Sequence, residues 1–415
     1  MEKLNKSLLF LIYFLSVASV SVALISSGYQ RNLFYIAIYC SLLGLILNFK
    51  RVKLSFSSLS FPIIILGLVK ICWYLIFQQK HGDLNFYNDY LDGGKKLLLG
   101  GFLVFYAEQF IRDFKNKQYK NLGLAILFCG FVSATAYGFF QALNHINRVE
   151  MGINRPTIAA YVYSTFSVFI IFALYTLRSK IGYVIAGATI IVSYCLIILT
   201  GTRAAMICYL FMVACLTLYH FRKIHIKSLV AVSILVAICF VALYKPYIKP
   251  KIDQTLSEVS NYQEGNDNTS LGARFSMWVV GVHAFVEHPV GQSMDTRADT
   301  TKSYVKQYPH YRSSLHYLNI HLHNEFIDSL SLQGLMGGLS LLFFYVMLIY
   351  TGIKKQLPVL LFSAGFMILY GITDVLLISS EAIQFYIVII ALGLCFPRGT
   401  VKPVQPAVSS PFRIK

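Results

Sequence analysis

The chain has 415 residues, of which 56% are hydrophobic and only 13% charged, and its mean hydropathy is +0.62. A soluble globular protein carries about 25% charged residues, so this composition excludes a soluble domain. The formal net charge of +18 follows the connections between apolar runs, a distribution that argues against nucleic acid as a partner.

Apolar runs of about 17–25 residues recur along the chain, which is the length that a helix needs to cross a bilayer. We therefore expect an all-α polytopic membrane protein with about twelve transmembrane helices. Nine spans lie in residues 1–244, a long polar loop occupies 245–322, three spans lie in 323–397, and a tail follows at 398–415. In chain order the expected spans are 7–27, 32–49, 60–77, 96–110, 121–143, 156–177, 181–200, 203–220, 228–244, 323–352, 357–377 and 381–397.

Basic residues gather in every second connection, and both termini are basic as well. The positive-inside rule assigns these segments to the cytoplasm, so the long polar loop is expected on the outer side. The first apolar run has no evident cleavage site, so we interpret it as a span and not as a signal peptide. The basic residues of the connections are Lys50, Arg51, Lys53, Arg112, Lys115, Lys117, Lys120, Arg178, Lys180, Arg222, Lys223, Lys227, Lys354 and Lys355.

All eight cysteines fall inside expected spans, and none lies in the polar loop. This pattern predicts neither a disulfide framework nor a cysteine metal motif.

The polar loop has helical order of its own. Apolar residues recur at helical spacing between Ser270 and His288, with Ser270 as the expected N-cap and His288-Pro289 as the end. Two shorter polar helices are expected at 247–262 and 297–308. Further on, Gly334, Gly337 and Gly338 indicate close helix packing or a kink in the tenth span.

Two arginines are the first candidates for chemistry. Arg203 lies between two spans at the outer face, where an ionisable residue is costly unless it pairs or serves a function. Arg274 lies in the first turn of the 270–288 helix, where a cation is disfavoured and an anionic partner is therefore indicated. A surface charge or an arginine reaching the lipid headgroups is the alternative.

His321 and His323 precede the tenth span, with Asn324 beside them as a further candidate for substrate binding. A histidine can accept a proton from a hydroxyl near neutral pH. Residues two apart do not share a helix face, so the two histidines are not expected to act together if both are helical. A zinc site built from these histidines and Glu325 is an alternative without a recognised ligand spacing, and an interfacial histidine without catalytic duty is another.

Three other charged residues are candidates for contact with substrate: Lys96 at an outer span end, Arg155 before Pro156, and Asp374 inside the eleventh span. Buried there, Asp374 is expected to pair with an arginine or to mark an ion path.

Three stretches together resemble the O-antigen ligases of enterobacteria, within the wider family of O-antigen ligases and polymerases. They are 199–204 around Arg203, 270–274 ending at Arg274, and 321–325 around His323, and 334–337 continues the likeness. The number of spans and the position of the large outer loop agree with that family.

The resemblance implies a multi-pass membrane glycosyltransferase of the GT-C type in the inner membrane, with cytoplasmic termini and a periplasmic site. The implied donor is an O-antigen polysaccharide on undecaprenyl diphosphate, the implied acceptor is the lipid A–core oligosaccharide, and membrane lipids surround the protein. The family is metal-independent and inverting and needs no cofactor. Its two essential arginines and one histidine fall on Arg203, Arg274 and His323, as diphosphate ligands and general base.

Two rival functions stay open at this point. An O-antigen polymerase would use the same donor with a second lipid-linked repeat as acceptor. A transporter or flippase would use Asp374 and Arg203 as relays, and it predicts inverted repeats and midplane charges that the sequence does not clearly contain.

Overall fold

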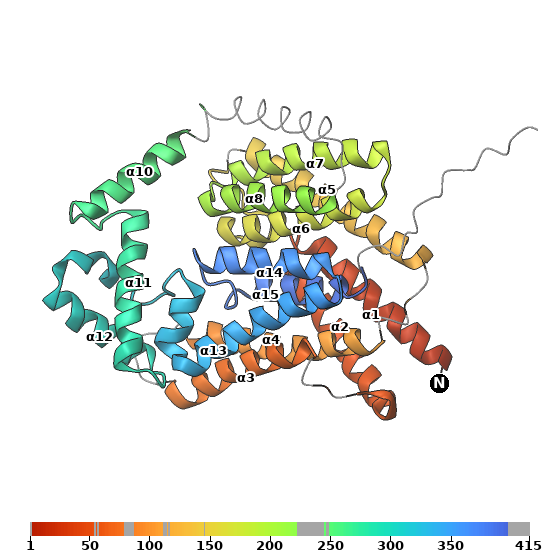
Figure 1. The fold of residues 1–415 in the computed structure, drawn as a ribbon, viewed down its shortest axis with the longest axis horizontal. Helices are drawn as coiled ribbons and strands as arrows, with labels where there is room; N and C mark the ends of the chain where they lie inside the picture. The colour runs from red at the N-terminus through yellow and green to blue at the C-terminus, as the bar shows by residue number, and fades with distance from the viewer. Residues whose placement is uncertain are drawn as a thin grey trace, which may run out of the picture.

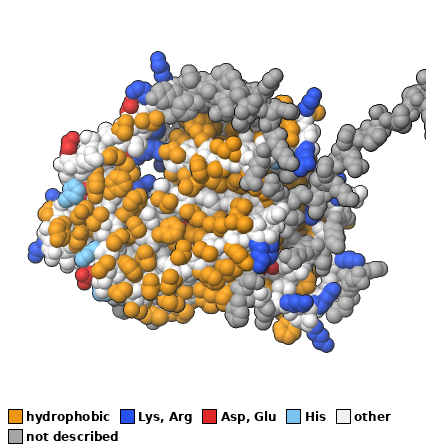
Figure 2. All heavy atoms as spheres, viewed as in Figure 1, with side chains coloured by type: hydrophobic (Ala, Val, Ile, Leu, Met, Phe, Trp, Pro, Cys, Tyr) orange, Lys and Arg blue, Asp and Glu red, His pale blue; other side chains and the backbone are white. Residues whose placement is uncertain are grey.

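The computed structural model describes residues 2–53, 55, 58–78, 87–110, 114, 117–144, 146–221, 245 and 249–396, and their regular structure is entirely helical (Figure 1). Eight of the described helices are long and apolar enough to cross a membrane, and two shorter ones are also apolar. Figure 2 shows apolar side chains spread across the helices, with basic side chains at the margins of this face. The expected fold class, a polytopic all-α membrane protein, is confirmed.

Eleven of the expected spans coincide with helices that pack together as a bundle. Their bounds are α1 (Glu2–Val22), α2 (Ser27–Leu47), α3 (Ser60–Phe77), α4 (Tyr87–Phe110), α5 (Lys117–Leu143), α6 (Pro156–Thr176), α7 (Lys180–Leu199), α8 (Arg203–His220), α13 (Glu325–Lys354), α14 (Pro358–Gly371) and α15 (Ser380–Gly393). The expected span 228–244, the tail 398–415 and the basic residues Arg112, Lys115, Arg222, Lys223 and Lys227 lie outside the described residues.

The eleventh span is shorter than expected. Helix α14 ends at Gly371, so Asp374 lies in the connection to α15 and not inside a span, which corrects the sequence-based placement. The apolar residues Val375 and Leu376 misled the prediction, because they are buried by packing although they are not helical. Hydropathy measures only apolarity, and it cannot separate a packed connection from the end of a span.

Helix α6 lies at the centre of the bundle, with nearly every side chain buried. Its hydroxyl groups are satisfied by other hydroxyl groups from the surrounding helices, because a polar atom left alone in an apolar interior is costly. The pairs are Tyr163 with Thr135 (2.9 Å), Ser164 with Tyr370 (2.5 Å), Thr165 with Tyr386 (2.8 Å) and Ser167 with Tyr209 (2.9 Å).

One end of the bundle carries the helices α10 (Lys249–Gln263), α11 (Ser270–Glu287) and α12 (Met294–Gln307), followed by the 3-10 segment η5 (Pro309–Tyr317) (Figure 1). We call residues 249–324 the polar cap. The three helices expected in this region are confirmed. The N-cap of α11 is Thr269 and not Ser270, because the Thr269 hydroxyl accepts the Gly272 amide at 3.0 Å.

The polar cap joins the bundle at a break in α13. Gly334 has φ +63°, and on either side of it the helix exchanges hydrogen bonds with the segment after α11: Leu335 N–H to Pro289 O (2.8 Å) and Gln292 N–H to Leu332 O (2.9 Å). A Cβ at Gly334 would meet the Pro289 carbonyl directly. The kink expected from the glycines is therefore confirmed at Gly334, and it anchors the cap.

Candidate functional site

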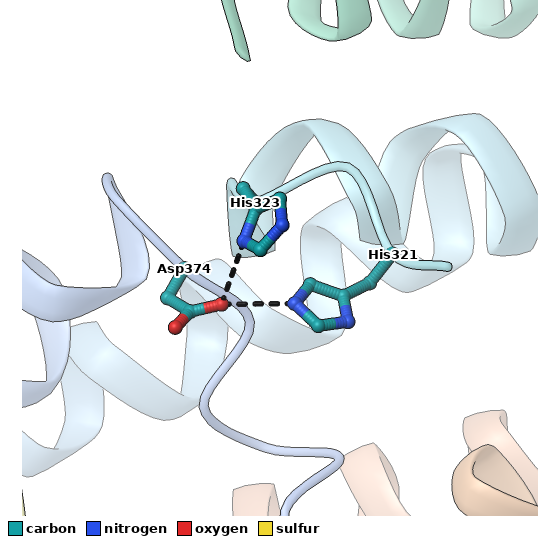
Figure 3. A group of neighbouring side chains, drawn as sticks. All are labelled: His321, His323 and Asp374. Carbon is teal, nitrogen blue, oxygen red and sulfur yellow. Dashed lines mark hydrogen bonds and ion pairs between the residues drawn. The ribbon is translucent and has the colours of Figure 1, made fainter. Parts of the chain in front are cut away.

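The site centres on one carboxylate and two imidazoles (Figure 3). Asp374 comes from the α14–α15 connection, whereas His321 and His323 come from the segment between η5 and α13. The Asp374 Oδ1 atom lies 2.9 Å from His321 Nε2 and 3.2 Å from His323 Nδ1. Both histidines are non-helical, so they share a partner even though residues two apart could not do so on a helix.

The hydrogen bonds fix the proton positions. An ionised carboxylate can only accept, so the ring nitrogens that face Asp374 carry the hydrogens. Burial alone would raise the pKa of Asp374, but hydrogen bonds from His321 and His323 outweigh it and hold this pKa below its ordinary value. With Nδ1 of His323 protonated, its Nε2 presents a free lone pair.

The backbone also contributes to the position of His323. This residue adopts φ +49°, a left-handed conformation that non-glycine residues rarely take and that occurs often at functional sites. Asn324 follows as the N-cap of α13 and accepts the amides of Phe326 and Ile327 at 3.1 Å each. Its amide nitrogen donates to the Ile372 carbonyl at 3.1 Å, so the Asn324 side chain links the start of α13 to the Asp374 connection.

Arg274 is the cation that acts on His323. Burial lowers the pKa of His323, the hydrogen bond to Asp374 raises it, and the positive charges of His321 and Arg274 lower it again, with a net shift below the ordinary value of 6.5. Among the described residues, Arg274 forms no hydrogen bond or ion pair. A half-buried guanidinium near a neutral histidine is therefore available for an anionic ligand.

Arg203 has different surroundings. At the start of α8 it donates to Thr255 (3.0 Å) and pairs with Glu258 (3.1 Å), both on α10. Glu258 also accepts the amide of Leu271, one turn before Arg274 on α11. Arg203 thus lies beside the first turn of α11 but already has a carboxylate partner.

The two remaining cations proposed from the sequence lie at the start of α6 and on α4. Arg155 is exposed at the N-cap of α6, and Lys96 is buried on α4, where it pairs with Asp92. Asp89 lies within electrostatic range of Arg155, Asp92 and His321, which connects these residues to the histidines.

A buried pair that the sequence did not single out holds the histidine segment. Arg297 on α12 pairs with Asp328 on α13 at 3.0 Å, with almost no exposed side-chain surface on either residue. Arg297 also donates to the Ile320 carbonyl (3.2 Å), and Asp328 accepts the Leu322 amide (3.1 Å) and the Tyr90 hydroxyl. The available signal was a carboxylate inside an apolar span, four residues after Asn324.

The zinc alternative required Glu325, which instead is fully buried and accepts the Leu377 amide (2.7 Å) and the Tyr345 hydroxyl (3.2 Å). That ligand set is therefore wrong. In the described part of the chain, the ligand atoms of His321, His323 and Asp374 lie within 4.8 Å of one another and could hold a metal ion. The same three residues also satisfy one another by direct hydrogen bonds.

Fold and site together define a multi-pass membrane protein with a histidine–carboxylate site at one end of its helices, within electrostatic range of an arginine that has no partner among the described residues. Residues 187–342 match a family model described as O-antigen ligase, and this stretch contains Arg203, Arg274 and His323. The chain is similar to an O-antigen ligase of Escherichia coli (strain K12), with 27% identity over 88% of each chain. It is also similar to an uncharacterised protein of Haemophilus influenzae, with 26% identity over 82% of this chain and 84% of the other.

These comparisons confirm the resemblance to the O-antigen ligase family that the three motifs predict. Asp374 lies outside the matched stretch, in the connection that completes the site from the C-terminal side.

Proposed function

We propose that the protein is a membrane glycosyltransferase that moves a saccharide from a polyprenyl diphosphate to a hydroxyl group of a second saccharide. The observation that carries this proposal is the Asp374–His323 pair next to Arg274, which has no partner among the described residues. A neutral imidazole oriented by a carboxylate is a general base, and an unpaired guanidinium is a ligand for phosphate.

In the proposed step, His323 Nε2 removes the proton of the acceptor hydroxyl as its oxygen attacks the anomeric carbon. The new C–O bond forms on the face opposite to the leaving group, so the configuration inverts. The bond from the anomeric carbon to phosphate breaks, and the diphosphate leaves with the electron pair. Asp374 stabilises the imidazolium that forms, as the carboxylate does in a catalytic triad.

Arg274 is assigned to the diphosphate, where it stabilises the charge that develops on the leaving group. Arg203 is assigned to the same group through its position beside the first turn of α11. Binding of the diphosphate by Arg203 then competes with Glu258, so the ligand must share or replace this carboxylate. The amides of the α11 first turn add a favourable dipole for an anion.

The name of the E. coli relative supports O-antigen as the transferred saccharide, and we assign undecaprenyl diphosphate as its carrier and lipid A–core as the acceptor. The basic connections between spans support cytoplasmic termini and a periplasmic site in the inner membrane. Within this proposal residues 245–322 form the periplasmic loop, and transfer needs no metal or other cofactor.

The test is transfer by purified protein in proteoliposomes, with lipid-linked O-antigen as donor and lipid A–core as acceptor, in the presence and absence of EDTA. The proposal expects a longer product on lipid A–core at the same rate in both conditions. Loss of transfer with EDTA, recovered by added Zn²⁺, would instead assign His321, His323 and Asp374 to a metal. No transfer by well-folded protein would overturn the function itself.

A further inference from the structure

A second polar cavity lies away from the residues assigned to the reaction. It has a volume of about 650 Å³ and opens between the N-terminal turns of α2, α4 and α15. Its walls combine cations, carboxylates, hydroxyls, an amide and one aromatic ring, in contrast to the apolar surface of the surrounding helices. The polar and aromatic lining residues are Ser27, Arg31, Tyr35, Asp92, Lys96, Ser380, Glu381 and Gln384.

Part of this lining is fixed by internal contacts. Asp92 pairs with Lys96 and accepts the Ser380 hydroxyl at 2.9 Å, which joins α4 to α15. Gln30 on α2 donates to the Glu381 carbonyl at 3.2 Å, which joins α2, the third wall of the cavity, to α15. The cavity is therefore built by contacts among three helices and is not a gap between loosely packed segments.

Two lining side chains keep unused hydrogen-bonding capacity. Gln384 is only 2% exposed, yet its Oε1 atom has no hydrogen-bond partner among the described residues. Arg31 is exposed at the rim and forms no hydrogen bond or ion pair within the described part of the chain. A buried acceptor without a partner is costly, so a ligand that donates a hydrogen bond to Gln384 Oε1 is stabilised there.

The cavity lies close to the reaction site. Helix α15, which lines it, directly follows the Asp374 connection, and a Cβ at Gly93, next to Asp92 on α4, would lie 3.0 Å from the Leu377 carbonyl of that connection. Asp89 on α4 is within electrostatic range of His321 as well as of Asp92 and Glu381.

We propose that this cavity is a carbohydrate subsite that holds sugar residues of the acceptor, an inference that rests on the proposed transfer reaction. In an inverting displacement, the nucleophile and the leaving diphosphate occupy opposite faces of the anomeric carbon. With the diphosphate on Arg274, the acceptor must reach His323 from a different direction, and we assign it to the cavity because α15, which lines it, directly follows the Asp374 connection.

The lining matches the chemistry of a saccharide. Sugar hydroxyls donate to Gln384 Oε1 and to the carboxylates of Asp92 and Glu381, and they accept from Lys96. Arg31 at the rim suits a phosphate or carboxylate substituent on the sugar. Tyr35 supplies an aromatic surface for the apolar face of a sugar ring. No lining residue lies within 187–342, so the subsite and the two catalytic arginines come from different parts of the chain.

The test is direct binding of deacylated lipopolysaccharide core oligosaccharide to full-length, detergent-purified His323→Ala protein, measured by titration calorimetry. In this background no transfer takes place, so affinity is read without turnover. Gln384→Leu removes the buried acceptor at similar volume, and Arg31→Ala alters an exposed side chain that the fold does not use. Lys302→Ala on α12, an exposed cation that pairs only with Asp299 among the described residues, is the matched control.

Both cavity variants are expected to weaken binding of the core oligosaccharide roughly tenfold or more, which is the loss of one good hydrogen bond or ionic contact. The Lys302→Ala variant should keep its affinity for the core oligosaccharide, and the affinity of both cavity variants for lipid-linked donor should stay unchanged. Unaltered oligosaccharide affinity in both cavity variants, or a loss confined to the donor, would overturn the inference. If binding follows this pattern but the unmodified protein transfers nothing in proteoliposomes, the proposed reaction is wrong and the subsite still stands.

Discussion

The bundle around α6 and the polar cap satisfy their buried polar groups with different chemistry. Around α6, buried hydroxyl groups pair with other hydroxyl groups, such as Ser164 with Tyr370. In the cap, the links are made by carboxylates, among them Asp267 with Ser313, Glu258 with Arg203 and Asp328 with Arg297. The helices around α6 are therefore linked by neutral groups, whereas the polar cap is held by charged ones.

This difference decides where single substitutions are damaging. Hydrogen bonds inside membrane proteins contribute about 0.6 kcal/mol on average, because the alternative partners are also in the membrane. Removing one member of a buried ion pair costs about 3–5 kcal/mol, because the other charge stays buried without a partner. The cap should therefore be sensitive to change and the bundle tolerant.

The largest effect is expected for His323→Asn. Asparagine accepts the left-handed backbone at this position but is no general base, so transfer should fall about 10²–10⁴-fold without loss of folding. The measurement is kcat in proteoliposomes, with the thermal unfolding temperature as control. Transfer at the unmodified rate would remove His323 from the mechanism.

Arg297→Met should come next, because it leaves Asp328 buried without its cation. We expect a loss of about 3–5 kcal/mol in unfolding free energy, measured by denaturant titration in detergent. The double substitution Arg297→Met with Asp328→Leu should recover much of this stability. It should not recover activity, because the Leu322 amide has then lost its acceptor. Full activity in the double variant would show that the pair does not position the histidines.

Arg274→Ala should cost about 2.7–4 kcal/mol of transition-state stabilisation, the range found when one charge-stabilising donor is removed. The measurement is kcat/KM for the lipid-linked donor, and stability should be unchanged because Arg274 has no partner among the described residues. An equal loss in Lys302→Ala, which alters a distant exposed cation, would point to a general charge effect instead.

Ser164→Ala tests the bundle. It removes a hydroxyl that contacts Tyr370, and we expect a loss of about 0.6 kcal/mol, and at most about 1.7 kcal/mol, in unfolding free energy. Transfer should continue at the unmodified rate. A loss as large as that of Arg297→Met would erase the difference between the two regions.

The smallest effect is a displacement of the pH profile. The pKa of His323 is lowered, so the neutral form that accepts a proton persists below the ordinary value and is lost only as pH falls through the lowered pKa. The acid limb of kcat/KM should therefore lie below pH 6.5. An acid limb above that value would mean that Asp374 outweighs burial and Arg274.

Much of the fold followed from the sequence, because apolar runs, basic connections and helical periodicity are local signals. The span 60–77 and the helix 270–287 are examples, and the motif resemblance supplied Arg203, Arg274 and His323. The role of Asp374 was not predicted, since Val375 and Leu376 are apolar for packing and not for membrane insertion. The Arg297–Asp328 pair is a tertiary contact between residues 31 apart, and no local sequence pattern predicts it.

The origin of Asp374 has a consequence for the biogenesis of the protein. The hairpin of α14 and α15 is synthesised after every other described helix, and it delivers both Asp374 and Gln384. Until this hairpin has been synthesised and inserted, His323 has no orienting carboxylate and the cavity lacks the wall formed by α15. If the proposed reaction is correct, a nascent chain that lacks the hairpin cannot yet carry out transfer.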